Sequence, residues 1–330
     1  MLVTLTNSVQ HLDEGLMAAR FDGRDLLEDL IAKGGAGTLE EAADFLIKAV
    51  LQLRQAAMGG DAAPPAADDA DDGFGCSVFQ VPGSNGYFFG RNFDWHTSDA
   101  MILETHPKGA FASITNIDLE FIQKTIIMNL PDDMLVGVAT LVPMDGMNEK
   151  GLCVSINRIS DPEGSVAQSR GNPKLLVTMF VRLLLNRAST TQEALELMDE
   201  YDFQSAFIPS IHFAIADASG DMVDVEYIDN EMSVIRTPIL TNHYLTPGKK
   251  FGIGTDESHT RFETLQERYS QREVFTSDDA RDMLDSVAKH NFETHMTTEW
   301  SAVFDQTAKM VRYFHREDYS RSWEFSLASN

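Results

Sequence analysis

The sequence is short of cysteine and of basic residues, and both shortages limit what the protein can be. Only Cys76 and Cys153 occur among 330 residues. Two cysteines make no disulfide framework, so we expect reduced thiols and a cytoplasmic location. Lys and Arg number 26 against 51 Asp and Glu, which gives a formal net charge of −25. Because phosphate binding needs clustered cations, this charge argues against nucleic acid and anionic membrane surfaces as partners.

Long hydrophobic runs and metal-binding spacings are also missing. The longest apolar stretch, 175–185, is too short to span a membrane and is interrupted by Arg182. The N-terminal residues lack a basic region followed by an apolar run, so we expect no signal peptide. No His-x-x-x-His or Cys-x-x-Cys pair occurs, and we therefore predict neither a metal nor a cofactor.

The first 75 residues differ in texture from the rest of the chain. Periodic apolar residues predict helices at 24–32 and 38–53, the second beginning with a capping box at Thr38–Glu41. At 58–75 the composition shifts to glycine, a Pro-Pro pair, alanine and a run of aspartates, which predicts a solvated acidic linker. We therefore expect a helical head, residues 1–75, that is tethered to a second domain, residues 76–330.

The second domain is predicted to alternate blocks of strands with blocks of helices. Its first two strands form a hairpin around the turn at 82–86. Further strands are expected at 134–141, 151–159, 212–244 and 301–316, and helices at 173–188, 190–201, 258–270 and 277–289. Segregated blocks of this kind are typical of an α+β fold in which helices cover antiparallel sheets.

Cys76 is the residue with the most suggestive surroundings. Buried cysteines are ordinarily small hydrophobes, but here the unhindered Gly75 precedes the thiol and the hairpin brings Arg91 toward the same strand. A guanidinium there would favour the thiolate. Asp94, three residues after Arg91, could hold an ammonium group. These four residues predict a nucleophilic site at the start of the hairpin.

This site lacks an evident base, because no histidine stands out as a partner for Cys76; His243 and His259 are only candidates. Cleavage between Gly75 and Cys76 would supply one. The new α-amine, with an ordinary pKa near 8, can accept the thiol proton. The head is then a propeptide, freed when the Cys76 thiol attacks the Gly75 carbonyl.

Several motifs in a fixed order resemble those of the cysteine N-terminal-nucleophile (Ntn) hydrolases that act on linear amides. They are Cys76, GRNFDW at 90–95, MNEKGL at 147–152 followed by Asn157, LTNHY at 240–244 and SHTRF at 258–262. This superfamily includes the choloylglycine hydrolases, the penicillin V acylases and, with longer propeptides, isopenicillin N acyltransferase and the acid ceramidase group. The resemblance implies a four-layer αββα sandwich and a hydrolase acting on carbon–nitrogen bonds other than peptide bonds, in linear amides.

The resemblance also implies roles for single residues. Cys76 resembles the nucleophile and N-terminal base, Arg91 its thiol partner, Asp94 the anchor of the α-amine, Asn157 the oxyanion-hole asparagine, Asn242 the asparagine that orders amine and substrate, and Arg261 the arginine that completes the network. Separately, Phe93, Trp95 and Met144 are expected to line an apolar acyl pocket, because they lie near Arg91 and Asn157 in the sequence.

Several functions stay open at this point. The favoured one is an autoprocessed amidohydrolase that cleaves an N-acyl amine or N-acyl amino acid through a Cys76 thioester. Alternatives are an acyltransferase using the same thioester, a bile salt or penicillin V hydrolase, and a non-catalytic binding protein on the same fold. The long head and the TNHY sequence at 241–244 favour the propeptide-bearing branch over bile-salt enzymes. A bound head after cleavage and a homo-oligomer are also possible.

Overall fold

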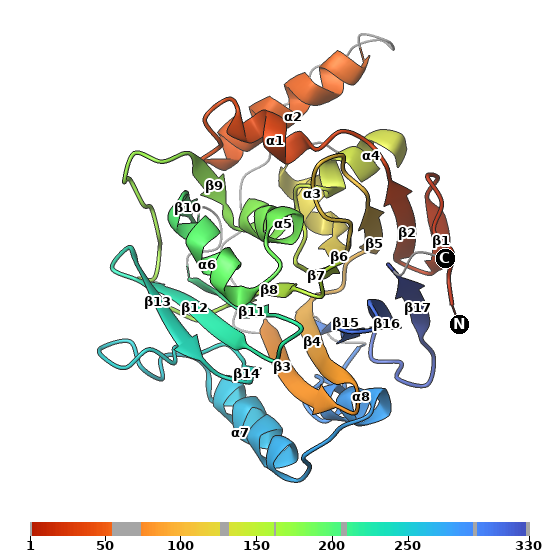
Figure 1. Ribbon diagram of the computed structural model, residues 1–330, viewed down its shortest axis with the longest axis vertical. Helices are drawn as coiled ribbons and strands as arrows, with labels where there is room; N and C mark the ends of the chain where they lie inside the picture. Colours follow the sequence, from red (N-terminus) through yellow and green to blue (C-terminus); the bar gives the residue numbers. More distant parts are fainter. Residues whose placement is uncertain are drawn as a thin grey trace.

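Two β-sheets pack face to face and carry helices on their outer faces in the computed structural model (Figure 1). The structure describes residues 2–54, 74–125, 132–161, 163–205, 210–292 and 296–327. The nine-stranded sheet has the order β1 (Gln10–Asp13), β2 (Leu16–Phe21), β5 (Ala100–Thr105), β6 (Ser113–Asp118), β7 (Asp145–Asn148), β8 (Cys153–Arg158), β11 (Ile211–Ala216), β12 (Met222–Ile228), β13 (Glu231–Arg236). The six-stranded sheet has the order β14 (Ile239–Leu240), β3 (Gly75–Gly83), β4 (Gly86–His96), β15 (Met296–Asp305), β16 (Met310–His315), β17 (Trp323–Ser326).

Each sheet has its own helical cover. Helices α5 (Val177–Arg187) and α6 (Thr191–Asp199) contact strands of the nine-stranded sheet, and α7 (Asp256–Ser270) and α8 (Ser277–Asp285) contact the six-stranded sheet. The remaining elements are α1 (Leu26–Ile31), α2 (Leu39–Arg54), α3 (Leu119–Thr125), α4 (Asp132–Ala139) and a small parallel pair, β9 (Lys174–Leu176) and β10 (Asp202–Gln204). The predicted α+β fold, a four-layer αββα sandwich, is confirmed.

Burial follows from this layering. Strands β5 and β6 are buried at every residue, as expected for strands covered on both faces. One apolar cluster fills the space around the nine-stranded sheet and reaches Val78 and Trp300 of the other sheet. A second cluster joins Phe79 and Val303 to Leu265 of α7 and Leu284 of α8. The inner strands β3 and β4 therefore lie between two packed layers.

The head is more deeply built into the fold than its sequence predicts. The expected helices at 24–32 and 38–53 are present as α1 and α2. The expectation of a purely helical, tethered head is wrong, however, because β1 and β2 also belong to it. Strand β2 pairs in parallel with β5 of the nine-stranded sheet. The apolar residues Leu16 and Ala18 of β2 are fully buried there.

The first residues of the chain also contact the other sheet. Leu2 forms a parallel bridge with Glu324 of β17, and the Val3 amide donates to the Glu324 carbonyl at 2.8 Å. Of the predicted linker, residues 58–73 lie outside the described residues. Gly75, its last residue, begins β3. The backbone on both sides of the expected cleavage point is thus part of one strand.

Two local expectations are also wrong. The run 134–141 is predicted as a strand but lies mostly in helix α4; short apolar runs fit either structure. The stretch 144–151, which lies between the expected strands 134–141 and 151–159 and has the composition of a turn, contains strand β7 at Asp145–Asn148. Among the described residues, no helix combines the length and the apolar character needed to cross a membrane.

Candidate active site

The β3–β4 hairpin brings the predicted site residues to one end of the six-stranded sheet. A two-residue turn connects the paired residues Gly83 and Gly86. The register of the hairpin then places Gly75 opposite Asp94 and Val78 opposite Arg91. Cys76 pairs with Phe93. The hairpin expected from the sequence is therefore present, with Cys76 and the two charged residues near its open end.

Polar side chains contact the backbone of Cys76 on both sides. The amide nitrogen donates to Asn242 Oδ1 at 2.6 Å. The carbonyl oxygen accepts a hydrogen bond from Arg261 Nη1. The thiol lies 3.9 Å from the Ile156 carbonyl and is 5% exposed. The residue expected to be the nucleophile is thus held in position by two of the residues expected to serve it.

Arg91 is fully buried next to the thiol. Its Nη2 donates to the Ile156 carbonyl at 2.9 Å, which the Cys76 thiol also approaches, and its Nη1 donates to the Asn92 carbonyl at 2.7 Å. Burial works against the charge, but the neighbouring Cys76 and Asp145 raise the pKa of Arg91 above its ordinary value. A guanidinium that stays charged here favours a thiolate at Cys76.

Asp145 is a buried partner of Arg91 that the sequence does not reveal. Its Oδ2 lies 3.4 Å from Arg91 Nε and accepts a hydrogen bond from Trp300 Nε1 at 3.0 Å. Its Oδ1 accepts from Asn116 Nδ2 at 2.6 Å. Asp145 was missed because it precedes a glycine in a stretch with the composition of a turn. These contacts hold the Asp145 carboxylate beside the guanidinium of Arg91.

Replacing Asp145 by asparagine is expected to destabilise the protein by about 3 kcal/mol, because it leaves the buried Arg91 charge without its carboxylate. Denaturant unfolding of the purified protein measures this. The control is Asp278→Asn, which removes a largely exposed carboxylate paired with Arg312 and Arg281 and should cost below about 1 kcal/mol. Equal losses in the two variants would contradict the assignment of Asp145 as the counter-ion of Arg91.

Asp94 lies against the expected cleavage point with one oxygen unused. Its Oδ1 accepts from Thr298 Oγ1 at 2.7 Å, while Oδ2 is buried and has no hydrogen-bond partner among the residues that the structure describes. A Cβ placed on Gly75 would come within 2.3 Å of that Oδ2. Burial raises the pKa of Asp94, and the positive charges of Arg261 and Lys289 oppose that rise. The free oxygen is suitably placed for an ammonium group near residue 76.

Asn242 and Arg261 form the other wall of the network. Arg261 lies on α7 and its Nη2 donates to Asn242 Oδ1 at 2.7 Å, while Nη1 also donates to Ser77 Oγ at 2.8 Å. Asn242 Nδ2 donates to the Arg158 carbonyl at 2.6 Å. The Asn242 oxygen therefore receives both the Cys76 amide and a guanidinium, which fixes the orientation of its side chain.

Asn157 lies one step further from the thiol. Its Nδ2 donates to the Thr241 carbonyl at 3.2 Å and its Oδ1 accepts from Ser155 Oγ at 2.9 Å. Asn157 is therefore linked to Cys76 indirectly, because it contacts Thr241, and the next residue, Asn242, contacts the Cys76 amide. Its role as an oxyanion donor stays a prediction.

The two histidine candidates are engaged elsewhere. Their rings stack at 4.1 Å, His243 Nδ1 lies 2.9 Å from Ser258 Oγ, and His259 Nε2 lies 2.9 Å from the Gly252 carbonyl. Burial lowers the pKa of His243 to about 4. These contacts favour a base other than histidine for Cys76.

A cavity of about 360 Å³, counted to its open mouth, adjoins the thiol. It is lined by Phe74, Cys76, Phe93, Asp94, Trp95, Phe121, Met144, Ile156, Arg158 and Ile211. The three residues expected to form an acyl pocket are among them. Phe74 and Arg158 are additions that the sequence did not indicate; the Arg158 guanidinium carbon lies 4.0 Å from the centre of the Phe74 ring.

Fold and site together define an αββα protein of the Ntn-hydrolase class with a cysteine at the start of an inner strand. Residues 81–318 match the model of the family described as acyl-coenzyme A:6-aminopenicillanic acid acyl-transferase, and the chain belongs to that family. A search of curated protein sequences finds no significant match.

Solved structures show the same fold. A mutant of conjugated bile acid hydrolase from Clostridium perfringens superposes with a TM-score of 0.61 at 15% identity, covering 77% of this chain and 93% of that one. Penicillin V acylase from Agrobacterium tumefaciens gives a TM-score of 0.52 at 18% identity, covering 73% and 83%. The family match confirms the expected superfamily, and the solved structures show its fold.

Proposed function

We propose that the protein is an autoprocessed cysteine amidohydrolase that cleaves a linear amide through a Cys76 thioester. One observation carries the proposal. The Gly75–Cys76 peptide lies within a polar network in which Asn242 and Arg261 contact the Cys76 backbone and a buried Asp94 oxygen has no hydrogen-bond partner in the described part of the chain. A structural role for Cys76 would leave that buried carboxylate oxygen unexplained, since buried acceptors are normally hydrogen-bonded.

Maturation follows from the same geometry. The thiol attacks the Gly75 carbonyl, its proton passes to the peptide nitrogen, which leaves as the α-amine of Cys76, and Gly75 is held as a thioester on the Cys76 sulfur. Water then hydrolyses the thioester and releases a carboxylate at Gly75. The Cys76 nitrogen, which becomes the α-amine, donates a hydrogen bond to Asn242 Oδ1 in the uncleaved chain. As an ammonium it gains further donors, for which the Asp94 oxygen is the available acceptor.

Turnover repeats this chemistry on a substrate. The neutral α-amine of Cys76 takes the thiol proton, and Arg91 favours the resulting thiolate. The thiolate attacks the amide carbonyl, the amine leaves with that proton, and water hydrolyses the acyl thioester. We assign stabilisation of the oxyanion to a site that includes Asn157; one such donor is typically worth about 3 kcal/mol of barrier.

The head itself indicates the acyl group. Phe74 lies on the acyl side of the Gly75–Cys76 bond, and it lines the cavity beside the thiol. Trp95 lies 6.3 Å from this ring, centre to centre, and Arg158 lies over its face. When the bond between Gly75 and Cys76 is cut, Phe74 and Gly75 are no longer joined to strand β3. We propose that the acyl group of the substrate, an aromatic one, takes the position of Phe74.

A substrate panel tests this assignment. N-phenylacetyl amides and penicillin V, which both carry an aromatic acyl group, should give a higher kcat/KM than straight-chain N-acyl amines, straight-chain N-acyl amino acids or taurocholate. Arg158→Leu should lower kcat/KM for the aromatic substrate about fivefold, since a cation–π contact is worth about 1 kcal/mol. The same variant should change the straight-chain substrate little. Taurocholate as the best substrate would refute this proposal. The net charge of −25 also disfavours such an anionic substrate, because like charges repel at long range.

Acyl transfer is the second candidate, because the family match names a transferase. A thioester on Cys76 passes its acyl group to an amine as readily as to water when the amine occupies the site. Product analysis with and without an added amine separates the two functions. A new amide at the expense of free acid supports transfer, and free acid alone supports hydrolysis.

We also expect the cleaved head to stay bound as a small α chain. Strand β2 lies between β1 and β5, and the first residues of the chain bond to β17. Releasing the head would therefore expose strand edges and the apolar face around Leu16 and Leu27. Both fragments should co-elute in size-exclusion chromatography and separate only in denaturant. A matured enzyme that elutes free of its head under native conditions would contradict this expectation.

A further inference from the structure

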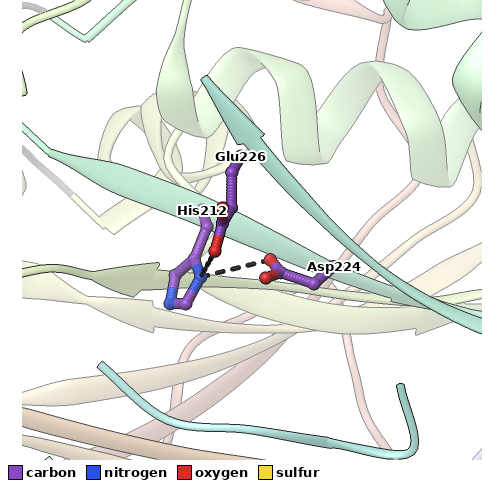
Figure 2. A group of neighbouring side chains, drawn as sticks. All are labelled: His212, Asp224 and Glu226. Atoms are coloured by element: carbon purple, nitrogen blue, oxygen red, sulfur yellow. Dashed lines mark ion pairs between the residues drawn. The ribbon is translucent and has the colours of Figure 1, made fainter. Parts of the chain in front are cut away.

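A second cluster of ionisable side chains lies in the nine-stranded sheet, apart from the cavity. His212 of β11 and Glu226 of β12 are cross-strand partners, and Asp224 is two residues earlier on β12. Residues two apart on a strand share a face, so all three side chains project together, as Figure 2 shows. Each is 0% exposed. The mechanism proposed for Cys76 uses none of them.

The imidazole nitrogen Nδ1 and the carboxylate oxygens of these three residues lie close together. His212 Nδ1 lies 3.1 Å from Asp224 Oδ1 and 3.9 Å from Glu226 Oε1, and one ligand atom from each residue falls within 4.8 Å of the others. Nδ1 and Asp224 Oδ1 lie at ion-pair distance, but among the described residues neither Nδ1 nor either Asp224 oxygen makes a hydrogen bond of good geometry. Buried acceptors in this state are uncommon in folded proteins. The arrangement leaves a point toward which one nitrogen and carboxylate oxygens are directed.

The surrounding contacts fix the side chains in this orientation. His212 Nε2 lies 2.8 Å from the Thr241 carbonyl. Since a carbonyl only accepts, Nε2 carries the proton and Nδ1 can present a lone pair to the carboxylates. The backbone amides of Leu245 and Thr246 donate to Glu226, the second at 3.0 Å. Metal-ligating histidines usually donate their other ring nitrogen to a carbonyl or carboxylate in this manner.

From these contacts we infer that His212, Asp224 and Glu226 bind one divalent transition-metal ion of the Zn²⁺ type. A neutral imidazole and two carboxylates carry two negative charges, which a divalent cation neutralises. Buried charges require such compensation. One imidazole nitrogen with carboxylate oxygens is a ligand set that suits Zn²⁺ or Mn²⁺, whereas Ca²⁺ and Mg²⁺ prefer oxygen alone.

The ion would act on structure and not on substrate. The Thr241 carbonyl that His212 contacts also accepts from Asn157, and Thr241 is followed by Asn242, which holds the Cys76 amide. A metal at this position therefore fixes the segment between β14 and the network around Cys76. The inference stands whether or not the protein is an amidase, because no ligand belongs to that network.

Metal analysis of the untagged full-length protein tests the inference. After exhaustive dialysis, elemental analysis should find about one Zn²⁺ per chain. Stripping with a chelator should lower Tm, and Zn²⁺ should restore it better than Mg²⁺ or Ca²⁺. Asp224→Asn and Glu226→Gln keep the side-chain shapes and should weaken metal binding roughly 10- to 100-fold. The matched control is Glu104→Gln, which removes a carboxylate that pairs with His106 and Arg20 and should leave the metal content unchanged.

Three results would overturn the inference. One is a wild-type protein that holds no metal and takes none up from Zn²⁺ or Mn²⁺ solution, which would show that the cluster holds a proton. Another is a wild-type metal content in both Asp224→Asn and Glu226→Gln, which would place the ion elsewhere. The third is a chelator that removes the metal without changing Tm. Because the first result needs no variant, a substitution that fails to fold leaves the test intact.

Discussion

Replacing Cys76 by alanine is expected to leave the chain at full length and to abolish amidase activity. Both outcomes have one cause, since the same sulfur attacks the Gly75 carbonyl during maturation and the substrate carbonyl during turnover. The substitution removes only the thiol of a nearly buried residue, so the fold should persist. Intact-mass measurement reports the cleavage, and amide hydrolysis reports the activity.

Cys153→Ala is the matched control. Cys153 is also buried, on β8, and burial raises the pKa of its thiol well above the ordinary value. A thiol that resists ionisation is a poor nucleophile, so this variant should mature and turn over as the wild type does. Loss of residues 1–75 from the Cys76→Ala protein at the wild-type rate would show that another group cleaves the chain.

Gly75→Ala is expected to slow maturation by a factor of about 100 or more. A Cβ at this position would lie 2.3 Å from Asp94 Oδ2 and 3.1 Å from Arg261 Nη2. Either the strand or the side chains of this network must therefore shift, and displacements of about 1 Å at a reacting centre cost roughly this factor. The time course of cleavage after synthesis in a cell-free system measures the effect.

Gly137→Ala is a suitable control for that variant, because a Cβ on Gly137 of α4 meets no atom of another described residue within 4 Å. It should mature at the wild-type rate. If Gly75→Ala also matured at that rate, the close packing of Gly75 against Asp94 would have no part in processing.

The residues around Cys76 could be predicted from the sequence in two ways, from local strand pairing and from the order of motifs shared with a known family. The hairpin signal at 82–86 places Arg91 and Asp94 near Cys76, and the motif order adds Asn242 and Arg261. All of them lie close to the Cys76–Gly75 segment in the structure. Their roles are still to be tested by the variants described above.

Other features depend on pairings that no local pattern contains. Strand β2 pairs with β5, which follows much later in the chain, so the head gives no sign in sequence that it belongs to a sheet. Asp145 becomes the partner of Arg91 only when β7 meets the hairpin layer. The spacing of His212, Asp224 and Glu226 is set by the β11–β12 register and matches no short metal motif. In each case tertiary contact decides what the sequence leaves open.

Mass spectrometry of the acid-quenched reaction tests the central claim most directly. Purified wild-type protein is mixed with an N-phenylacetyl amide and denatured within the first turnovers. The account predicts a large fragment whose N-terminal residue is Cys76 and whose mass is increased by one acyl group, with no adduct on the Cys76→Ala chain. Turnover by a chain that still carries residues 1–75 in covalent linkage, or an acyl group on any residue other than Cys76, would contradict it.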